Sequence, residues 1–127
     1  MSLRDKFIET LGAQDDPNAV GSGGVKYDGA KIPVFQGAID YFPRAIELVA
    51  AISAFGASKY AWKGWRTVPN GVERYSNALV RHLMAESKGE FEDSDSGLPH
   101  AAHGAWNALA RLELILQEKE KENAEPK

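Results

Sequence analysis

The sequence predicts an all-α fold, a small helical bundle of three main helices that follows an irregular N-terminal arm. Three segments carry helix start and stop signals, and no segment alternates apolar and polar residues between hairpin turns as a strand does. With 127 residues, 43% of them hydrophobic, the chain can build one modest core but not two full domains. We therefore expect a single helical domain.

The predicted domain organisation has three parts. Residues 1–33 form the arm, because residues 13–33 are dense in Gly, Asp, Pro and Asn, which favour turns over regular structure. Residues 34–121 form the helical domain. Residues 122–127 form a charged, solvated tail.

Each of the three helices is predicted from its own boundary signals. Pro43 suits a first helical turn, so the first helix covers about residues 44–60 and ends before the KGW segment. The second covers about residues 72–88, with the following glycine as its C-terminal stop. The third covers about residues 99–121 and frays into the charged tail.

Composition excludes several classes of function. The net charge of -3 and the pI near 5.6 give no cationic field for a phosphate backbone, so we expect no nucleic-acid partner. The absence of cysteine excludes disulfides and thiolate metal sites. The longest apolar stretch, which starts at Leu48, is shorter than the roughly 20 residues needed to span a bilayer, and the N-terminus lacks a secretory apolar core. A cytoplasmic protein without a membrane partner is expected.

One narrow stripe of the third predicted helix is polar, and it holds two of the chain's three histidines. The stripe contains His100, His103, Asn107 and Arg111. The opposite, apolar arc contains Ala101, Ala105, Leu109, Leu112 and Leu116. The polar stripe is either solvated surface or a functional face. Residues 100–110 contain no charged residue other than histidine, which favours a functional face because solvated faces normally carry charges.

Glu47 is the single acidic residue of the first predicted helix, and its neighbours are apolar. Its own face holds small residues, namely Ala50, Ala51, Ala54 and Ser58. Small residues permit close helix packing, but they also leave room for a ligand or a hydrated metal beside a buried acid. Because a lone buried carboxylate is costly unless paired, hydrogen-bonded or metal-bound, we expect Glu47 to be functional.

The second predicted helix has two polar features. His82 shares a face with apolar and aromatic residues, so it points inward, either as a core histidine or as a site residue. A separate stripe, which is either solvated or a holder of phosphate oxygens, contains Arg74, Asn77, Arg81 and Lys88.

Between the second and third helices, four acidic residues lie close together: Glu90, Glu92, Asp93 and Asp95. Hard divalent cations such as Mg²⁺ prefer carboxylate oxygens, and this segment leads directly to the histidines. The alternative is an acidic surface loop. The chain has no P-loop, no H-E-x-x-H and no His-Asp dipeptide, which excludes the familiar ATPase, metallopeptidase and HD phosphohydrolase chemistries.

Four segments together resemble the N-terminal domain of phage-type dATP/dGTP diphosphohydrolases: KYDGAK, FGASKYAWKGW, RYSNALVRHLMAESKGE and SGLPHAAHGAWNAL. Those proteins are similar in kind to the MazG-like all-α nucleotide pyrophosphohydrolases. The resemblance covers roughly residues 26–116. It implies that Mg²⁺ or Mn²⁺ holds a purine (deoxy)nucleoside triphosphate such as dGTP or dATP. Water then attacks near the α-phosphorus and releases the monophosphate and pyrophosphate.

The same resemblance implies a set of site residues. MazG-like enzymes carry an E-x-x-E motif and a later E-x-x-D motif. Glu90 and Asp93 match the second spacing, whereas Glu47 is followed at that interval by Ala50. We therefore expect Glu47, Glu90 and Asp93 as catalytic residues and metal ligands. The histidines either complete the ligand set or contact phosphate or base, and they are His82, His100 and His103.

The expected substrate-binding residues are Lys31, Lys59, Tyr60, Trp65, Arg81 and Asn107. Of these, Lys31 and its neighbour Lys26 lie in the arm, which we expect to close over bound phosphates. The competing function is a non-catalytic phage accessory or nucleotide-sensing module that binds a partner through Trp62 and Trp65. In either case we expect a homodimer or homotetramer, because three helices bury only a small core.

Overall fold

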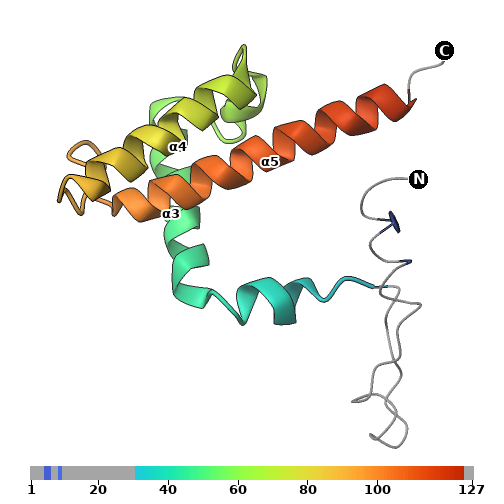
Figure 1. The fold of residues 1–127 in the computed structure, drawn as a ribbon, viewed down its shortest axis with the longest axis horizontal. Helices are drawn as coiled ribbons and strands as arrows, with labels where there is room; N and C mark the ends of the chain where they lie inside the picture. The colour runs from blue at the N-terminus through green and yellow to red at the C-terminus, as the bar shows by residue number, and fades with distance from the viewer. Residues whose placement is uncertain (1–4, 7–8, 10–30, 125–127) are drawn as a thin grey trace, which may run out of the picture. The chain divides into compact units, whose positions relative to one another are not determined.

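The computed structural model describes residues 5, 6, 9 and 31–124, and within them the fold is all-α (Figure 1). The three main helices are α3 (Pro43–Lys59), α4 (Gly71–Ser87) and α5 (His100–Ala124). Two short turns of helix, η1 (Phe35–Ile39) and η2 (Gly64–Thr67), precede α3 and α4. The predicted fold class is confirmed.

The chain divides into two compact units, residues 1–41 and residues 42–127. The predicted arm, residues 1–33, falls in the first unit and lies almost wholly outside the described residues, Lys26 included. The arm and its closure over phosphates therefore stay predictions. In the part of the chain that is described, no helix has the length and apolar character needed to cross a bilayer.

The observed helix boundaries follow the local signals in the sequence. Pro43 occupies the first turn of α3, and Gly89 follows α4 with a φ of 99°, a left-handed conformation that favours glycine. Helix α5 continues to Ala124, beyond the predicted end near residue 121. An ion pair of 3.6 Å between Lys119 and Glu122, one turn apart, supports this extension.

Helices α4 and α5 lie side by side and form an antiparallel hairpin (Figure 1). His82, near the end of α4, meets His100 at the start of α5, whereas Gly71, at the start of α4, meets Leu114 further along α5. A Cβ atom at position 71 would lie 2.6 Å from the Leu114 Cδ1 atom. The glycine therefore permits the close approach of the two helices.

A group of aromatic rings joins η2, α4 and α5. Trp65, Tyr75 and Trp106 pack edge to face, with ring centroids 5.6 to 6.2 Å apart. The Tyr75 hydroxyl donates to the Trp65 carbonyl at 2.7 Å, and the Trp106 Nε1 atom donates to the Ser53 Oγ atom of α3 at 2.9 Å. The hydroxyl of Tyr75 and the indole N–H of Trp106 thus both have hydrogen-bond partners, as polar groups of part-buried aromatic side chains usually do.

Helix α5 buries its polar stripe and exposes its apolar arc. His100, His103 and Asn107 are 5%, 8% and 5% exposed, whereas Leu109 and Leu112 are 52% and 50% exposed. The interpretation of the stripe as solvated surface is therefore wrong. Among the described residues, the buried apolar side chains are confined to Ile52, Ala102 and Ala110, so this core is small.

The aromatic group should contribute much of the stability of the second unit. Replacing Trp106 with Phe keeps an aromatic ring but removes the hydrogen bond to Ser53, and should lower the free energy of unfolding by about 1 kcal/mol. Trp106→Ala should cost about 3 kcal/mol or more. Urea unfolding followed by circular dichroism measures both changes. Trp62→Ala, at a position that is 69% exposed, is the control and should stay within about 0.5 kcal/mol of the parent.

Candidate functional site

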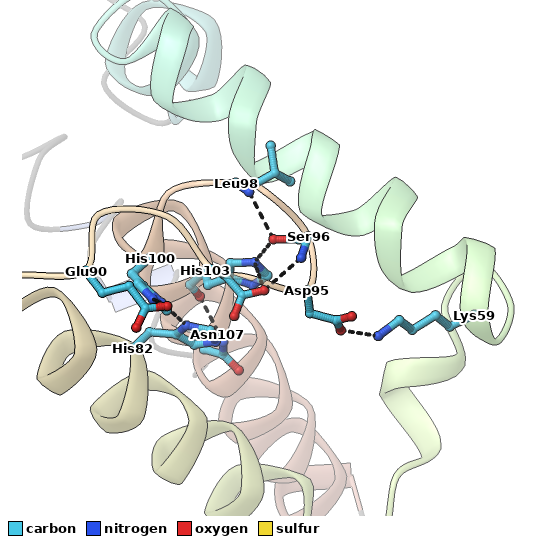
Figure 2. Close-up of polar contacts among 10 residues, drawn as sticks. Lys59, His82, Glu90, Asp95, Ser96, Leu98, His100, His103 and Asn107 are labelled. Atoms are coloured by element: carbon cyan, nitrogen blue, oxygen red, sulfur yellow. Dashed lines mark hydrogen bonds and ion pairs between the residues drawn. The ribbon is translucent and has the colours of Figure 1, made fainter.

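All three histidines of the chain meet at one end of the α4–α5 hairpin (Figure 2). The Nδ1 atoms of His82 and His100 lie 2.8 Å apart. The rings of His82 and His103 are stacked, with centroids 4.4 Å apart and an interplanar angle of 9°. His100 and His103 are buried and His82 is half-buried. We call these three residues the histidine cluster.

The loop between α4 and α5, residues 88–99, folds back over this end of the hairpin. A single antiparallel bridge joins Glu92 and Pro99. The His100 amide donates to the Phe91 carbonyl at 2.9 Å, and the Asp93 amide donates to the Leu98 carbonyl at 2.8 Å. These bonds hold the acidic loop closed and bring its carboxylates to the histidine cluster.

Two carboxylates of the loop face histidines. The Glu90 Oε1 atom lies 3.2 Å from the His100 Nε2 atom, and the Asp93 Oδ2 atom lies 3.8 Å from the His103 Nε2 atom. Ser96 connects the second pair. Its Oγ atom lies 2.7 Å from His103 Nε2 (Figure 2), and its amide donates to Asp93 Oδ2 at 2.9 Å. Asp93 is thus held in place by its own loop.

The His100 Nε2 atom is buried and makes no hydrogen bond, although Glu90 is close by. The 3.2 Å contact with Glu90 lacks hydrogen-bond alignment. An unsatisfied buried polar atom costs free energy of the order of 1–3 kcal/mol. Native structures tolerate such atoms mainly where a function or a bound group uses them.

The environment of His82 and His103 favours their neutral forms. Burial lowers the pKa of His82, and the neighbouring His103 and His100 lower it further. Burial also lowers the pKa of His103, an effect that the charge of Asp93 partly offsets. Burial acts to raise the pKa of Asp93, but the hydrogen bonds from Ser96 and the nearby imidazoles outweigh it and hold that pKa below the usual range. The lowered pKa values of His82 and His103 favour their neutral forms, and the lowered pKa of Asp93 favours its carboxylate form.

Helix α3 closes one side of the site through Lys59 and Phe55. The Lys59 ammonium pairs with Asp95 of the acidic loop at 2.5 Å, and this hydrogen bond raises the pKa of Lys59. The same ammonium lies 4.6 Å from the centroid of the Phe55 ring, whose edge contact with His103 has a centroid distance of 6.5 Å. The positively charged ammonium group of Lys59 therefore lies at the rim of the histidine cluster.

The sequence-predicted substrate residues lie in different environments. Asn107 is buried one turn after His103 and donates to the His103 carbonyl at 2.8 Å. Tyr60 is 84% exposed, and Arg81 is also exposed on α4. Trp65 packs within the aromatic group, so of the two tryptophans expected as exposed partner anchors only Trp62 is exposed. Lys31 belongs to the other compact unit and is exposed.

Glu47 does not have the expected environment. We expected a buried acid facing small residues, but Glu47 is exposed on α3, as is Ala50. The prediction of burial is wrong because α3 packs on α5 through other residues, among them Ile52 and Ser53. Among the described residues, the group whose ligand atoms lie close enough to share a metal does not include Glu47. Its role as a ligand or catalytic acid stays a prediction.

Sequence reasoning missed Ser96 and Phe55, which both contact His103. The signal for Ser96 was the D-S-D-S-G segment, in which serine hydroxyls commonly bond to nearby backbone. Ser96 does this too, because its Oγ atom accepts a hydrogen bond from the Leu98 amide at 3.1 Å. No local signal predicts Phe55, since its contact depends on how α3 packs on α5.

Two open hollows in the described structure lie away from the histidine cluster. The larger, about 620 Å³, lies between the start of α4 and the second half of α5, and its lining includes Arg66, Gly71 and Lys121. The smaller, about 200 Å³, adjoins Trp65, Trp106 and Leu109. Neither of these two hollows is lined by a histidine.

Comparison with known proteins gives one family and one relative. The sequence profile of the family described as dATP/dGTP diphosphohydrolase, N-terminal, matches residues 22–124. A protein of Salmonella phage PMBT28 named dATP/dGTP diphosphohydrolase is 38% identical over 82 residues, which are 65% of this chain. The matched part spans 26% of the length of that relative. No solved structure matches the chain.

The buried imidazoles should make the stability of the metal-free protein depend on pH. The folded-state pKa values of His82 and His103 lie below the unfolded value of about 6.5, so the unfolded chain binds more protons as the pH falls. The melting temperature should be constant above about pH 7.5 and should fall as the pH is lowered through about 6.5. Thermal unfolding in a chelating buffer measures it.

A control variant isolates the histidines in this pH profile. His103→Gln removes one titrating group and should flatten the decline between about pH 7 and pH 5, where carboxylates with low pKa values do not yet titrate. A melting temperature that is independent of pH over this range in the parent protein would contradict the assignment of neutral, buried imidazoles.

Proposed function

The chain belongs to the dATP/dGTP diphosphohydrolase N-terminal family, and from this premise we propose that it is a metal-dependent nucleotide diphosphohydrolase that acts at the histidine cluster. The proposed substrate is a purine (deoxy)nucleoside triphosphate such as dGTP or dATP. Water adds to the α-phosphorus, the bond from that phosphorus to the bridging oxygen breaks, and the monophosphate and pyrophosphate leave. The relative's name supports this reaction.

The observation that carries the proposal is the burial of polar residues that the fold does not need. The start of α5 buries two imidazoles and an amide, although the same helix has an apolar arc that would pack at lower cost. One buried nitrogen, His100 Nε2, remains without a hydrogen bond. A site whose function requires those groups explains why the polar stripe is the buried one.

The donor set fits a divalent cation. Atoms of His82, Asp93 and His100 that can ligate a metal lie within 4.8 Å of one another. Lowered pKa values favour the neutral form of His82 and the ionised form of Asp93, which are the protonation states that bind metals. The proposal includes Mg²⁺ or Mn²⁺, which the family resemblance implies. Bound there, the cation would neutralise phosphate charge and lower the pKa of water.

The residues of the chain divide the remaining tasks. Glu90 has a side chain that is 55% exposed beside His100, so its carboxylate can accept the proton of the attacking water. The Lys59 ammonium, at the rim, and the exposed Arg81 on α4 can bind phosphate oxygens. Asn107 fixes the turn that carries His103. Glu47 remains a proposed participant without a supporting contact.

One observation supports the alternative that the chain is a non-catalytic binding module. Trp62 is 69% exposed, and exposed tryptophans often anchor partner proteins. In that case the cluster would bind a nucleotide without hydrolysing it, and the chain would act as a nucleotide sensor or phage accessory module. Nucleotide binding without pyrophosphate release would support this alternative.

Turnover depends on Glu90 in the proposed mechanism. With dGTP or dATP and Mn²⁺ or Mg²⁺, the parent protein should release pyrophosphate, and Glu90→Gln should lower kcat at least about 100-fold because a proton acceptor is lost. A coupled assay for pyrophosphate measures the rate. Glu92→Gln is the matched control, since it removes the same charge from an exposed position of the same loop. Equal rates for the two variants would remove Glu90 from the mechanism.

Self-association is the second part of the proposal. The apolar arc of α5 is largely exposed, and Val80, Leu83 and Met84 of α4 are each at least half exposed as well. The described chain leaves this surface uncovered, and large exposed apolar surfaces mark interfaces. We propose that a second copy of the chain packs on the arc and gives a homodimer or homotetramer.

The oligomeric state can be tested at the arc. Leu109→Gln combined with Leu112→Gln places two polar groups on the arc and should shift the protein toward the 13.9 kDa monomer. Size-exclusion chromatography with light scattering measures the mass. Glu118→Gln, an exposed change on another face of α5, should leave the mass of the parent unchanged. A parent that is monomeric at every concentration would refute the proposal.

A further inference from the structure

We propose that His82, His100 and Asp93 form a three-ligand site for a transition-metal ion of the Zn²⁺ or Mn²⁺ type, and that Mg²⁺ alone does not occupy it. The inference rests on the proposed metal dependence and narrows the identity of the ion. It also takes Glu90 out of the ligand set, where the sequence placed it, and adds to its proposed role as proton acceptor the role of orienting His100.

The kinds of donor atom decide which ion is bound. Two of the three donors are imidazole nitrogens, which suit Zn²⁺, Mn²⁺ and other first-row transition ions. Mg²⁺ takes oxygen ligands in an octahedral shell and gives up its waters reluctantly. His100 is 5% exposed, so an ion bound there has lost most of its hydration on that side. A buried site with two nitrogens therefore disfavours Mg²⁺.

The two histidines point the same nitrogen at each other. Two nitrogens that each lie about 2.1 Å from one ion are about 3.0 Å apart at a right angle and about 3.4 Å apart at a tetrahedral angle. The Nδ1 atoms of His82 and His100 lie 2.8 Å apart, so the two rings need to separate by only a few tenths of an ångström to hold an ion. In the metal-free protein, one of the two must donate a proton to the other. A bound ion takes the place of that hydrogen bond, so both Nδ1 atoms act as lone-pair donors and the imidazole that donated carries its proton on Nε2 instead.

Glu90 then acts on His100 from the opposite side of the ring. The His100 Nε2 atom faces Glu90 Oε1 at 3.2 Å, and a small rotation of this exposed carboxylate would align a hydrogen bond. A carboxylate that accepts a hydrogen bond from the Nε2–H group of His100 fixes the tautomer that has a free Nδ1 lone pair. Metal-ligating histidines usually have such a partner, and its loss typically weakens metal binding 10- to 100-fold.

Asp93 is held by a comparable arrangement. Its Oδ2 atom accepts a hydrogen bond from the Ser96 amide at 2.9 Å, and the Ser96 hydroxyl is anchored in turn by His103 and by the Leu98 amide. These contacts fix the carboxylate within the loop. His103 therefore supports the third ligand and stacks on His82, without belonging to the ligand set.

Isothermal titration of the chelator-treated full chain with each metal alone tests the assignment, with no nucleotide present. We expect one Zn²⁺ per chain, weaker binding of Mn²⁺, and no heat from Mg²⁺ at millimolar concentration. The visible absorption of Co²⁺ provides a second readout of nitrogen ligation.

Variants separate ligands from positioning residues. His82→Gln, His100→Gln and Asp93→Asn should each lose at least about 100-fold in Zn²⁺ affinity, and Glu90→Gln about 10-fold. Glu92→Gln should bind as the parent does. Circular dichroism verifies that each variant is folded. If a histidine variant does not fold, the Zn²⁺ affinity of Asp93→Asn tests the site instead. Parent-like Zn²⁺ binding in His82→Gln or His100→Gln, or Mg²⁺ binding as tight as that of Zn²⁺, would overturn the site.

The result for Glu90 also decides its role. If Glu90→Gln loses Zn²⁺ as completely as His100→Gln, Glu90 is a ligand and the three-residue assignment is wrong. The two proposals fail separately. Zn²⁺ binding at these residues without pyrophosphate release would refute only the diphosphohydrolase activity. Nucleotide turnover with Mg²⁺ in a protein that binds no Zn²⁺ would refute only the transition-metal site.

Discussion

The contact between α4 and the polar stripe of α5 is the constraint on which the rest of the described structure depends. It requires the two helices to run antiparallel at close range. At one end of the pair Gly71 permits this approach, and at the other end His82 contacts His100. The connecting loop must then fold back over the histidines, and it does so with a single bridge and two left-handed glycines. The positions of Glu90 and Asp93 follow from this geometry.

Local signals in the sequence were sufficient for the elements and for half of the site. Proline at the start of α3 and glycine after α4 act within one or two residues, so the helix boundaries could be predicted closely. The spacing of His100, His103 and Asn107 places them on one stripe of any helix, whatever surrounds it. The acidic loop was adjacent in sequence, so its approach to those histidines needed no long-range information.

Tertiary packing determined the parts that could not be predicted. A helical wheel identifies which residues share a face, but the direction of that face depends on the neighbouring helices. For α5 the polar face turned inward, and for α3 the face of Glu47 turned outward. The contact of Phe55 with His103 joins residues 48 positions apart in the chain, and no spacing rule relates them. The sequence could not decide whether His82 is a core residue or a site residue, because both kinds of histidine have the same sequence pattern.

The outward-facing arc of α5 has a consequence for the abundance at which the protein can persist. If a second copy packs on this arc, as proposed above, association stabilises the folded chain by mass action, so the folded fraction rises with protein concentration. Newly made chains at low copy number would remain targets for cellular proteases until enough partners accumulate. The expression level would then set how much of the protein stays folded, and that fraction would rise gradually with concentration.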